Sequence, residues 1–146
     1  MSDLLDVNAL IALVDADHIH HQRMRRWFDE HAHDGWATCP ITENGFIRVV
    51  SNAKYPSGQR TSAELVGTLR DLKTAGVEAY QFWPDDITFT DNALFRPEYL
   101  VRSGHVTDAY LLGLAAKHGG RLVSFDGSLP WQAIRGASSS LVERPA

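Results

Sequence analysis

The sequence predicts a three-layer α/β fold in which helices cover both faces of a central, mainly parallel sheet. Short apolar runs alternate along the chain with longer amphipathic segments, which is the order of strands and helices in such a sheet. The 146 residues match one ordinary domain, which buries about 68–70% of its unfolded surface. The chain is 44% hydrophobic and 22% charged, which is typical of a folded globular protein. We therefore expect a single domain over residues 1–146.

The first half of the chain shows an apolar run before Asp6, a second after Asn8, and one-faced helical spacing in Met24, Trp27 and Phe28. Pro40 ends a further apolar run. The expected elements are a strand at 4–5, a short helix over 9–14, a helix over 18–32, a strand at 36–39, a helix over 41–50, and a helix from Thr61 or Ser62 to Gly76.

The second half contains the most regular helical pattern of the sequence, which begins at Thr107 as a cap and stops at Gly119-Gly120. The segment 87–106 has weak periodicity. The expected elements are a strand over 77–83, a possible short helix at 92–95, a helix over 107–118, a strand over 121–125 and a last edge strand at 140–142.

Four acidic residues occupy positions where acids are unusual. Asp6 and Asp126 each follow an apolar strand directly. Glu43 and Asp108 each follow a threonine and precede apolar residues by three, four and seven positions, so each points inward from a first helical turn. In an open parallel sheet, the carboxyl ends of strands and the amino ends of the following helices share one edge. We therefore expect the four carboxylates to converge there.

Four converging carboxylates repel one another unless a cation lies between them. An all-oxygen site of this kind selects Mg²⁺, or Mn²⁺, over zinc and leaves open positions for phosphate oxygens. Taken singly, Asp108 could serve the helix dipole, Asp126 an Asp-Gly turn, and Asp6 the end of a strand. Their placement on one edge favours a metal site for phosphodiester hydrolysis.

The sequence resembles the PIN-domain nucleases, and more closely the VapC-type toxins of toxin–antitoxin pairs. Four segments carry the resemblance, and they span essentially the whole chain: Leu4-Leu5-Asp6-Val7-Asn8-Ala9-Leu10, Ile41-Thr42-Glu43-Asn44-Gly45-Phe46-Ile47-Arg48-Val49, His105-Val106-Thr107-Asp108-Ala109 and Leu122-Val123-Ser124-Phe125-Asp126. The resemblance implies a Mg²⁺- or Mn²⁺-dependent endoribonuclease that forms homodimers and is inhibited by a VapB-like antitoxin. It places the conserved acids of the family on Asp6, Glu43, Asp108 and Asp126.

We expect Asp6 and Asp108 to bind the principal metal, with Glu43 and Asp126 completing the site directly or through water. Three further residues are candidates for a supporting role. Asn8 lies two positions after the first acid, where the family has a small polar residue, and Ser124 lies two positions before the last acid. Arg48 follows Asn44 by one helical turn and is a candidate for binding phosphate.

The remaining polar and aromatic groups are interpreted as structural. His18, His20 and His21 lack a thiolate or spaced carboxylate, so we expect surface histidines and no metal site. The arginines of the second helix could contact RNA or an antitoxin, but solvation is the simpler role. Cys39 is expected to be buried. The following are expected in the core or in an antitoxin groove: Trp83, Phe89, Phe95, Tyr99 and Trp131.

The chain carries 14 basic and 18 acidic residues, a net charge of −4 that at first argues against a nucleic-acid partner. Without the four candidate ligands, however, the acidic and basic residues are equal in number. RNA binding is therefore expected to depend on the metal. We expect a cytoplasmic protein for three reasons. The sequence has one cysteine, no apolar run is long enough for a membrane span, and the start MSDLLDVNA lacks a signal-peptide pattern.

Two other functions compete with ribonuclease activity. An aspartate-nucleophile phosphatase has a second acid two positions after the first, but here that residue is Asn8. A PIN-like binding module without catalysis would keep the fold and partner surface but would not need all four acids. An RNA cleavage assay with Mg²⁺ or EDTA separates the last alternative from an enzyme.

Overall fold

The computed structural model describes residues 1–75 and 79–146, and its centre is a parallel five-stranded sheet. The strand order is β3-β2-β1-β4-β5, and each pair of neighbours is parallel. This confirms the expected mainly parallel sheet. The strands are short: β1 (Asp3–Leu5), β2 (Trp36–Thr38), β3 (Tyr80–Phe82), β4 (Leu122–Val123) and β5 (Val142–Glu143).

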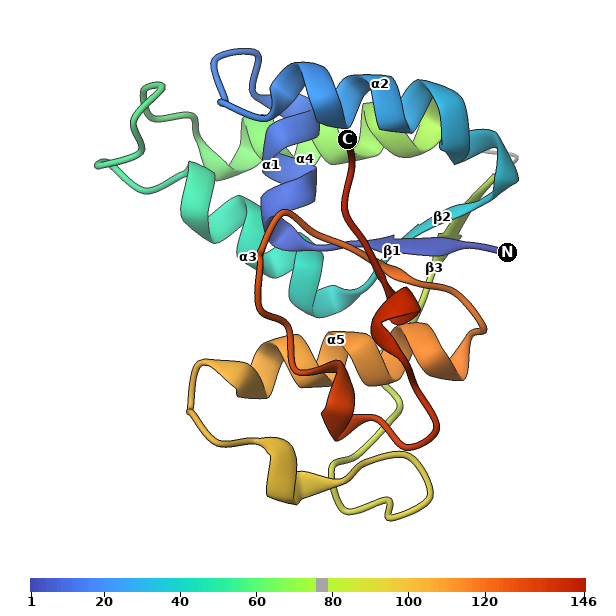
Figure 1. Ribbon diagram of the computed structural model, residues 1–146. Coiled ribbons are helices and arrows are strands. Elements are labelled where there is room, and N and C mark those ends of the chain that lie inside the picture. The colour runs from blue at the N-terminus through green and yellow to red at the C-terminus, as the bar shows by residue number, and fades with distance from the viewer. Residues whose placement is uncertain (76–78) are drawn as a thin grey trace.

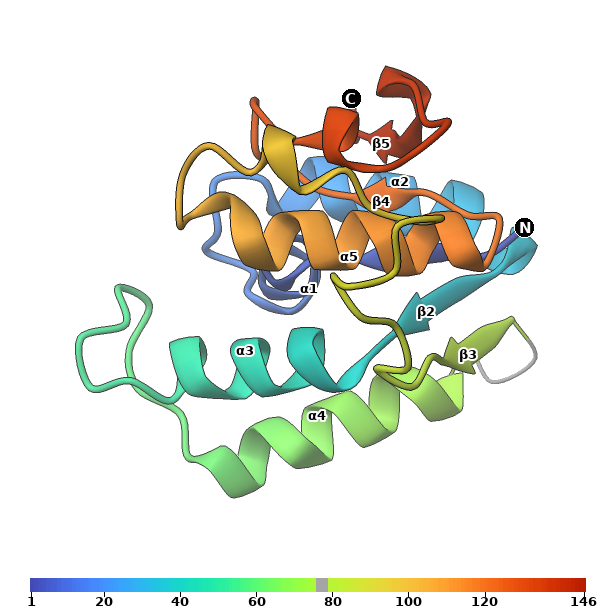
Figure 2. The same cartoon turned by 90° about the horizontal axis from the view of Figure 1, so that it is seen from below.

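Helices cover both faces of the sheet, which confirms the three-layer architecture. Figure 1 shows α2 and α4 on one side of β1 and α5 on the other, and Figure 2 shows α3 and α4 running side by side. The α-helices of the described residues are α1 (Val7–Val14), α2 (His21–His31), α3 (Pro40–Val50), α4 (Ser62–Ala75) and α5 (His105–Lys117).

Successive residues of a strand point to opposite faces, so the sheet divides the interior into two cores. Leu5 packs with α1 to α4 in the first core, together with Trp36 and Val123 from the neighbouring strands. Leu4 faces the other way and packs with Leu122 against α5 in the second core. Because both faces are buried at the centre of the sheet, β1 and β4 carry consecutive apolar residues, Leu4-Leu5 and Leu122-Val123.

The helix α3 begins and packs as its sequence dictates. Pro40 occupies the first turn, where its missing N–H costs no hydrogen bond, and the Thr42 hydroxyl accepts from the Cys39 N–H at 3.0 Å. A methyl group on Gly45 would lie 2.6 Å from a side-chain carbon of Val7. Glycine therefore lets α3 approach the start of α1, directly after Asp6.

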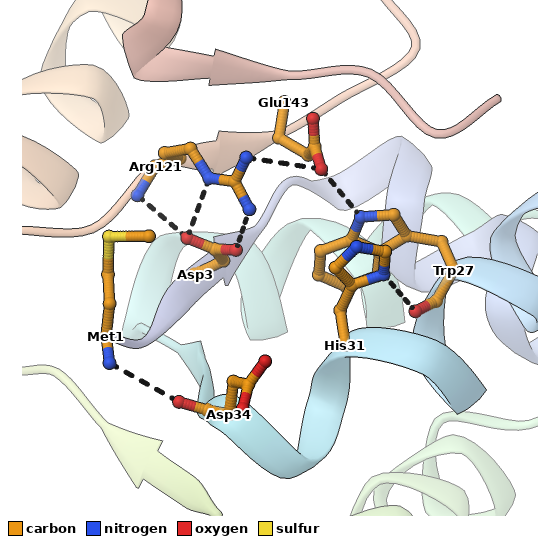
Figure 3. A network of polar contacts seen from close by, with 7 residues as sticks. All are labelled: Met1, Asp3, Trp27, His31, Asp34, Arg121 and Glu143. Carbon is orange, nitrogen blue, oxygen red and sulfur yellow. Dashed lines mark hydrogen bonds and ion pairs between the residues drawn. The ribbon is translucent and has the colours of Figure 1, made fainter.

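An ion-pair network ties the C-terminal strand to the rest of the sheet (Figure 3). The Arg121 guanidinium donates to both carboxylate oxygens of buried Asp3, at 3.3 and 2.8 Å. Its other nitrogen lies 3.3 Å from Glu143 of β5, and Glu143 accepts from the Trp27 indole at 3.0 Å. The network links β1, α2 and β5 through Arg121, the residue that precedes β4.

Several element boundaries differ from the sequence expectations. Helix α5 begins at His105 instead of after a Thr107 cap, because the carbonyls of Arg102 and Ser103 already accept hydrogen bonds from residues 105 and 106. Residues 92–95 form a turn initiated by Asp91, not a helix. The last strand is Val142–Glu143, because residues 139–141 form a 3₁₀ turn. Gly76 and the start of the strand expected over 77–83 lie outside the described residues.

None of the helices in the described part of the chain combines the length and apolarity that a bilayer crossing needs.

Candidate metal centre

Three of the four predicted acids meet at the carboxyl edge of the sheet. Asp6 follows β1 and caps α1, Asp126 follows β4 by three residues, and Asp108 lies in the first turn of α5. One carboxylate oxygen from each lies within 4.8 Å of the others. The convergence follows from the topology, since β1 and β4 are parallel neighbours and α5 begins at the same edge.

Asp6 is held rigidly by hydrogen bonds to both of its carboxylate oxygens. One oxygen accepts from the Val7 N–H at 2.7 Å, and the other accepts from the Ser124 hydroxyl at 2.9 Å. The side chain is buried, and Ser124 is fully so. Ser124 also accepts from the Asp126 N–H at 3.1 Å, so one hydroxyl connects two of the three acids.

Asn8 contacts the third acid from the first turn of α1. Its amide nitrogen lies 3.4 Å from an Asp126 carboxylate oxygen, at the long end of hydrogen-bond distance. The structure thus places two of the three predicted supporting residues, Asn8 and Ser124, beside the acidic group.

The electrostatics of this cluster favour a bound cation. Burial raises the pKa of Asp6 to about 6, the nearby charges of Asp108 and Asp126 act in the same direction, and the hydrogen bonds from Ser124 and Val7 oppose them. Burial, followed by the charge of Asp126, also raises the pKa of Asp108. A divalent cation between the three oxygens removes this repulsion, and hard carboxylate oxygens suit Mg²⁺ or Mn²⁺.

The cluster opens onto the surface, which a hydrolytic site requires. Asp108 is half-buried and Asp126 is exposed, and both line a hollow of about 550 Å³. The acids therefore offer a rigid, buried ligand on one side and access for a phosphate group on the other.

Glu43 lies outside the group of three oxygens that the described residues bring together. Its carboxylate forms an ion pair with the ammonium group of Lys73 on α4, at 2.7 Å. It also accepts from the Thr38 hydroxyl at 2.5 Å, and the Tyr80 hydroxyl lies 3.4 Å away. Glu43 points inward from the first turn of α3 as expected, but in this structure the ammonium group of Lys73 neutralises its charge.

Arg48 is exposed in the last turn of α3 and lines a different hollow, of about 330 Å³, beside Tyr55 and Pro56. It does not line the hollow that contains Asp108 and Asp126. Its expected role in phosphate binding therefore gains no support from its position.

The residues interpreted as structural are found in structural roles. His20 stacks on Phe125, with ring centroids 4.4 Å apart, and His21 hydrogen-bonds to the Ala12 carbonyl. Cys39, Trp83 and Phe95 are buried. Phe89 and Trp131 pack against the second core, whereas Tyr99 is exposed beneath the Arg96 guanidinium.

Four residues near the site were not anticipated. Lys73 neutralises Glu43, and the Tyr80 hydroxyl contacts it. Both residues are far from Glu43 in the sequence, and the sequence around them gives no sign of these contacts. Arg102 and His105 line the hollow beside Asp108. His105 precedes Asp108 by three positions on one helix, so helical spacing alone places both residues on one face.

A family model described as PIN domain matches residues 4–130, which include the four candidate acids of the site, Asp6, Glu43, Asp108 and Asp126. The chain belongs to the PIN domain family. Ribonuclease VapC44 of Mycobacterium tuberculosis, strain H37Rv, is 41% identical over 138 residues, covering 94% of this chain and 95% of that protein. Ribonuclease VapC38 of the same strain is 45% identical over 123 residues and 84% of each chain. This PIN domain chain is also similar in fold to a solved structure, described as VapBC2 from Rickettsia felis bound to a DNA fragment from its promoter. The TM-score is 0.66 over the full length of both chains, at 14% identity.

Proposed function

We propose that this protein is a metal-dependent endoribonuclease and the toxin of a VapBC-type toxin–antitoxin pair. The observation that carries the proposal is the convergence of Asp6, Asp108 and Asp126 within 4.8 Å beside an open hollow. The names of its relatives support the substrate class, because proteins about 40% identical over nearly the whole chain are called ribonucleases.

Asp6, Asp108 and Asp126 are the residues that would hold Mg²⁺ or Mn²⁺. When bound, such an ion polarises the scissile phosphate and offsets the negative charge that develops during in-line attack. Ser124 and the Val7 N–H fix the orientation of Asp6, and Asn8 restrains Asp126. We place Glu43 at the margin of the site, where it acts through water and its charge is balanced by Lys73.

The same proposal includes the expected partners. Single-stranded RNA is the substrate, and a VapB-like antitoxin is the inhibitor, since the similar fold from Rickettsia felis comes from a VapBC complex. We also propose a homodimer and one PIN domain over residues 1–146. The family model ends at residue 130, but β5 pairs with β4 and completes the sheet.

The alternatives are less consistent with the site. A non-catalytic binding module has no need of a rigid Asp6 within 4.8 Å of two other acids. A phosphatase that uses Asp6 as a nucleophile would need an acid at position 8, and Asn8 contacts Asp126 instead.

The test is cleavage of single-stranded RNA by the purified, antitoxin-free protein with Mg²⁺ or with EDTA. We expect cleavage with Mg²⁺, none with EDTA, and a rate reduction of at least about 100-fold in Asp108→Asn, as for the loss of a main catalytic group. Asp71→Asn, on the exposed surface of α4, is the matched control and should cleave as the wild type does. Cleavage that persists in EDTA would contradict the proposal.

A further inference from the structure

The hollow beside the acidic group is lined by a cationic side chain as well as by acids. Asp108 and Asp126 line it together with Arg102, from the turn before α5, and His105, the first residue of α5. Four exposed residues complete the lining: Ser103, Gly104, Gly127 and Ser128. The surface beside Asp108 and Asp126 is therefore polar and includes the positive charge of Arg102.

Arg102 and His105 form a defined pair. Two guanidinium nitrogens of Arg102, Nε and Nη2, lie 3.2 and 2.7 Å from Nε2 of His105. This nitrogen can accept a hydrogen bond only when the ring is neutral and its proton is on Nδ1. His105 is half-buried at the helix start, so it positions the longer and exposed side chain of Arg102.

The positive charge of Arg102 is not neutralised by an acid within residues 1–75 and 79–146. Arg25, Arg60 and Arg121 each lie within 4.0 Å of a carboxylate, whereas the recorded side-chain partner of Arg102 is His105. The Nε hydrogen and one Nη2 hydrogen of Arg102 are directed at His105, so its other hydrogens and its positive charge remain for a ligand.

Charge balance identifies the class of that ligand. Three carboxylates and one divalent ion carry a net charge of −1, which opposes the approach of a polyanion. Arg102 brings the lining to neutrality and offers a planar donor group suited to phosphate oxygens. We propose that Arg102, positioned by His105, binds a backbone phosphate of the RNA next to the scissile one. This inference rests on the ribonuclease function proposed above, and it assigns a substrate contact that is separate from the metal ligands.

The test measures binding of a fluorescein-labelled, single-stranded RNA 12-mer in Ca²⁺, over a range of KCl concentrations. Arg102→Gln should weaken binding about tenfold, because a hydrogen bond to a charged group is lost. It should also reduce the slope of log Kd against log salt by about 0.7, the value for one phosphate contact on a single strand. Arg102→Lys should keep the slope and recover part of the affinity. Arg70→Gln, an exposed position on α4 outside the hollow, should match the wild type.

Cleavage in Mg²⁺ adds a second readout. Arg102→Gln should raise KM about tenfold and change kcat by less than about twofold, because the residue contacts the substrate away from the reacting phosphate. If the wild type binds and cleaves RNA but Arg102→Gln has the same slope and KM, the Arg102 subsite is wrong. If the wild type neither binds nor cleaves, the proposed function itself fails.

Discussion

Asp6 combines burial with negative charge, and the described residues give it no cationic partner. Its recorded side-chain partners are the Val7 N–H and the Ser124 hydroxyl. Burial raises its pKa from 3.8 to about 6. The folded protein therefore binds a proton more tightly at Asp6 than the unfolded chain does, and the contribution of Asp6 to metal-free stability falls as the pH rises through this window.

The first prediction compares metal-free wild type with Asp6→Asn at pH 4 and pH 7. The pKa difference corresponds to about 3 kcal/mol over the whole titration, of which about 2 kcal/mol falls between pH 4 and pH 7. The variant should therefore gain about 2 kcal/mol in unfolding free energy, relative to wild type, between these pH values. Urea unfolding in EDTA measures this difference, with Asp71→Asn as the control. If the difference in unfolding free energy between wild type and Asp6→Asn is the same at pH 4 and pH 7, the raised pKa of Asp6 is wrong.

Ser124 supports two acids through a single hydroxyl, so its removal should weaken metal binding without removing a ligand. We expect Ser124→Ala to lower Mn²⁺ affinity by about 10- to 100-fold, as measured by isothermal titration calorimetry. Ser140→Ala, outside the site, is the control. Unchanged affinity would mean that the Asp6 and Asp126 carboxylates hold their positions without this contact.

At the scale of elements, the contact between Asp3 and Arg121 holds β1 to β4. Asp3 is buried, so Arg121→Gln removes the cation paired with its carboxylate, and only the N–H of residue 121 still donates to it, at 3.1 Å in the wild type. This change should reduce the unfolding free energy by about 3 kcal/mol. The double variant Asp3→Asn/Arg121→Gln should lose less than the sum of the two single changes. Arg25→Gln, which breaks an exposed pair with Asp29, should cost less than about 1 kcal/mol in the same urea unfolding experiment. If the loss in the double variant equals the sum of the two single losses, Asp3 and Arg121 do not stabilise the fold through their contact with each other.

The sequence was sufficient to predict the elements that have strong local signals and the edge where they meet. Apolar runs ending in Asp6 and Asp126 placed two parallel strands, and helical spacing put Asp108 on an inward face. Boundaries were less predictable. The short helix considered at 92–95 lay in a segment of weak periodicity, and an antiparallel bridge between Phe95 and Ile134 holds that segment against the core instead.

The surroundings of Glu43 could not be predicted because they depend on tertiary contacts. The sequence around Glu43 is enough to predict that it lies on the inward face of α3. Its partners Lys73 and Tyr80, however, come from α4 and β3. How α4 packs against α3 decides whether Glu43 reaches a metal or a lysine. Helical periodicity carries no information about that packing.

For the molecule as a whole, the net charge of −4 and the acidic centre lead us to expect that RNA binding requires a bound metal. With Ca²⁺, which can occupy a carboxylate site, the labelled RNA 12-mer should bind. In EDTA, the affinity should fall by at least about tenfold, because three uncompensated carboxylates face the phosphates. Equal binding in both conditions, measured by fluorescence anisotropy, would place the RNA on another surface.

We propose that Asp6, Asp108 and Asp126 jointly hold a divalent metal ion. The anomalous scattering of Mn²⁺ in crystals of the protein soaked with MnCl₂ tests this most directly. We expect an anomalous peak in contact with oxygens of all three carboxylates, with Glu43 outside direct contact. A peak elsewhere, or no peak between these three residues at saturating Mn²⁺, would contradict it.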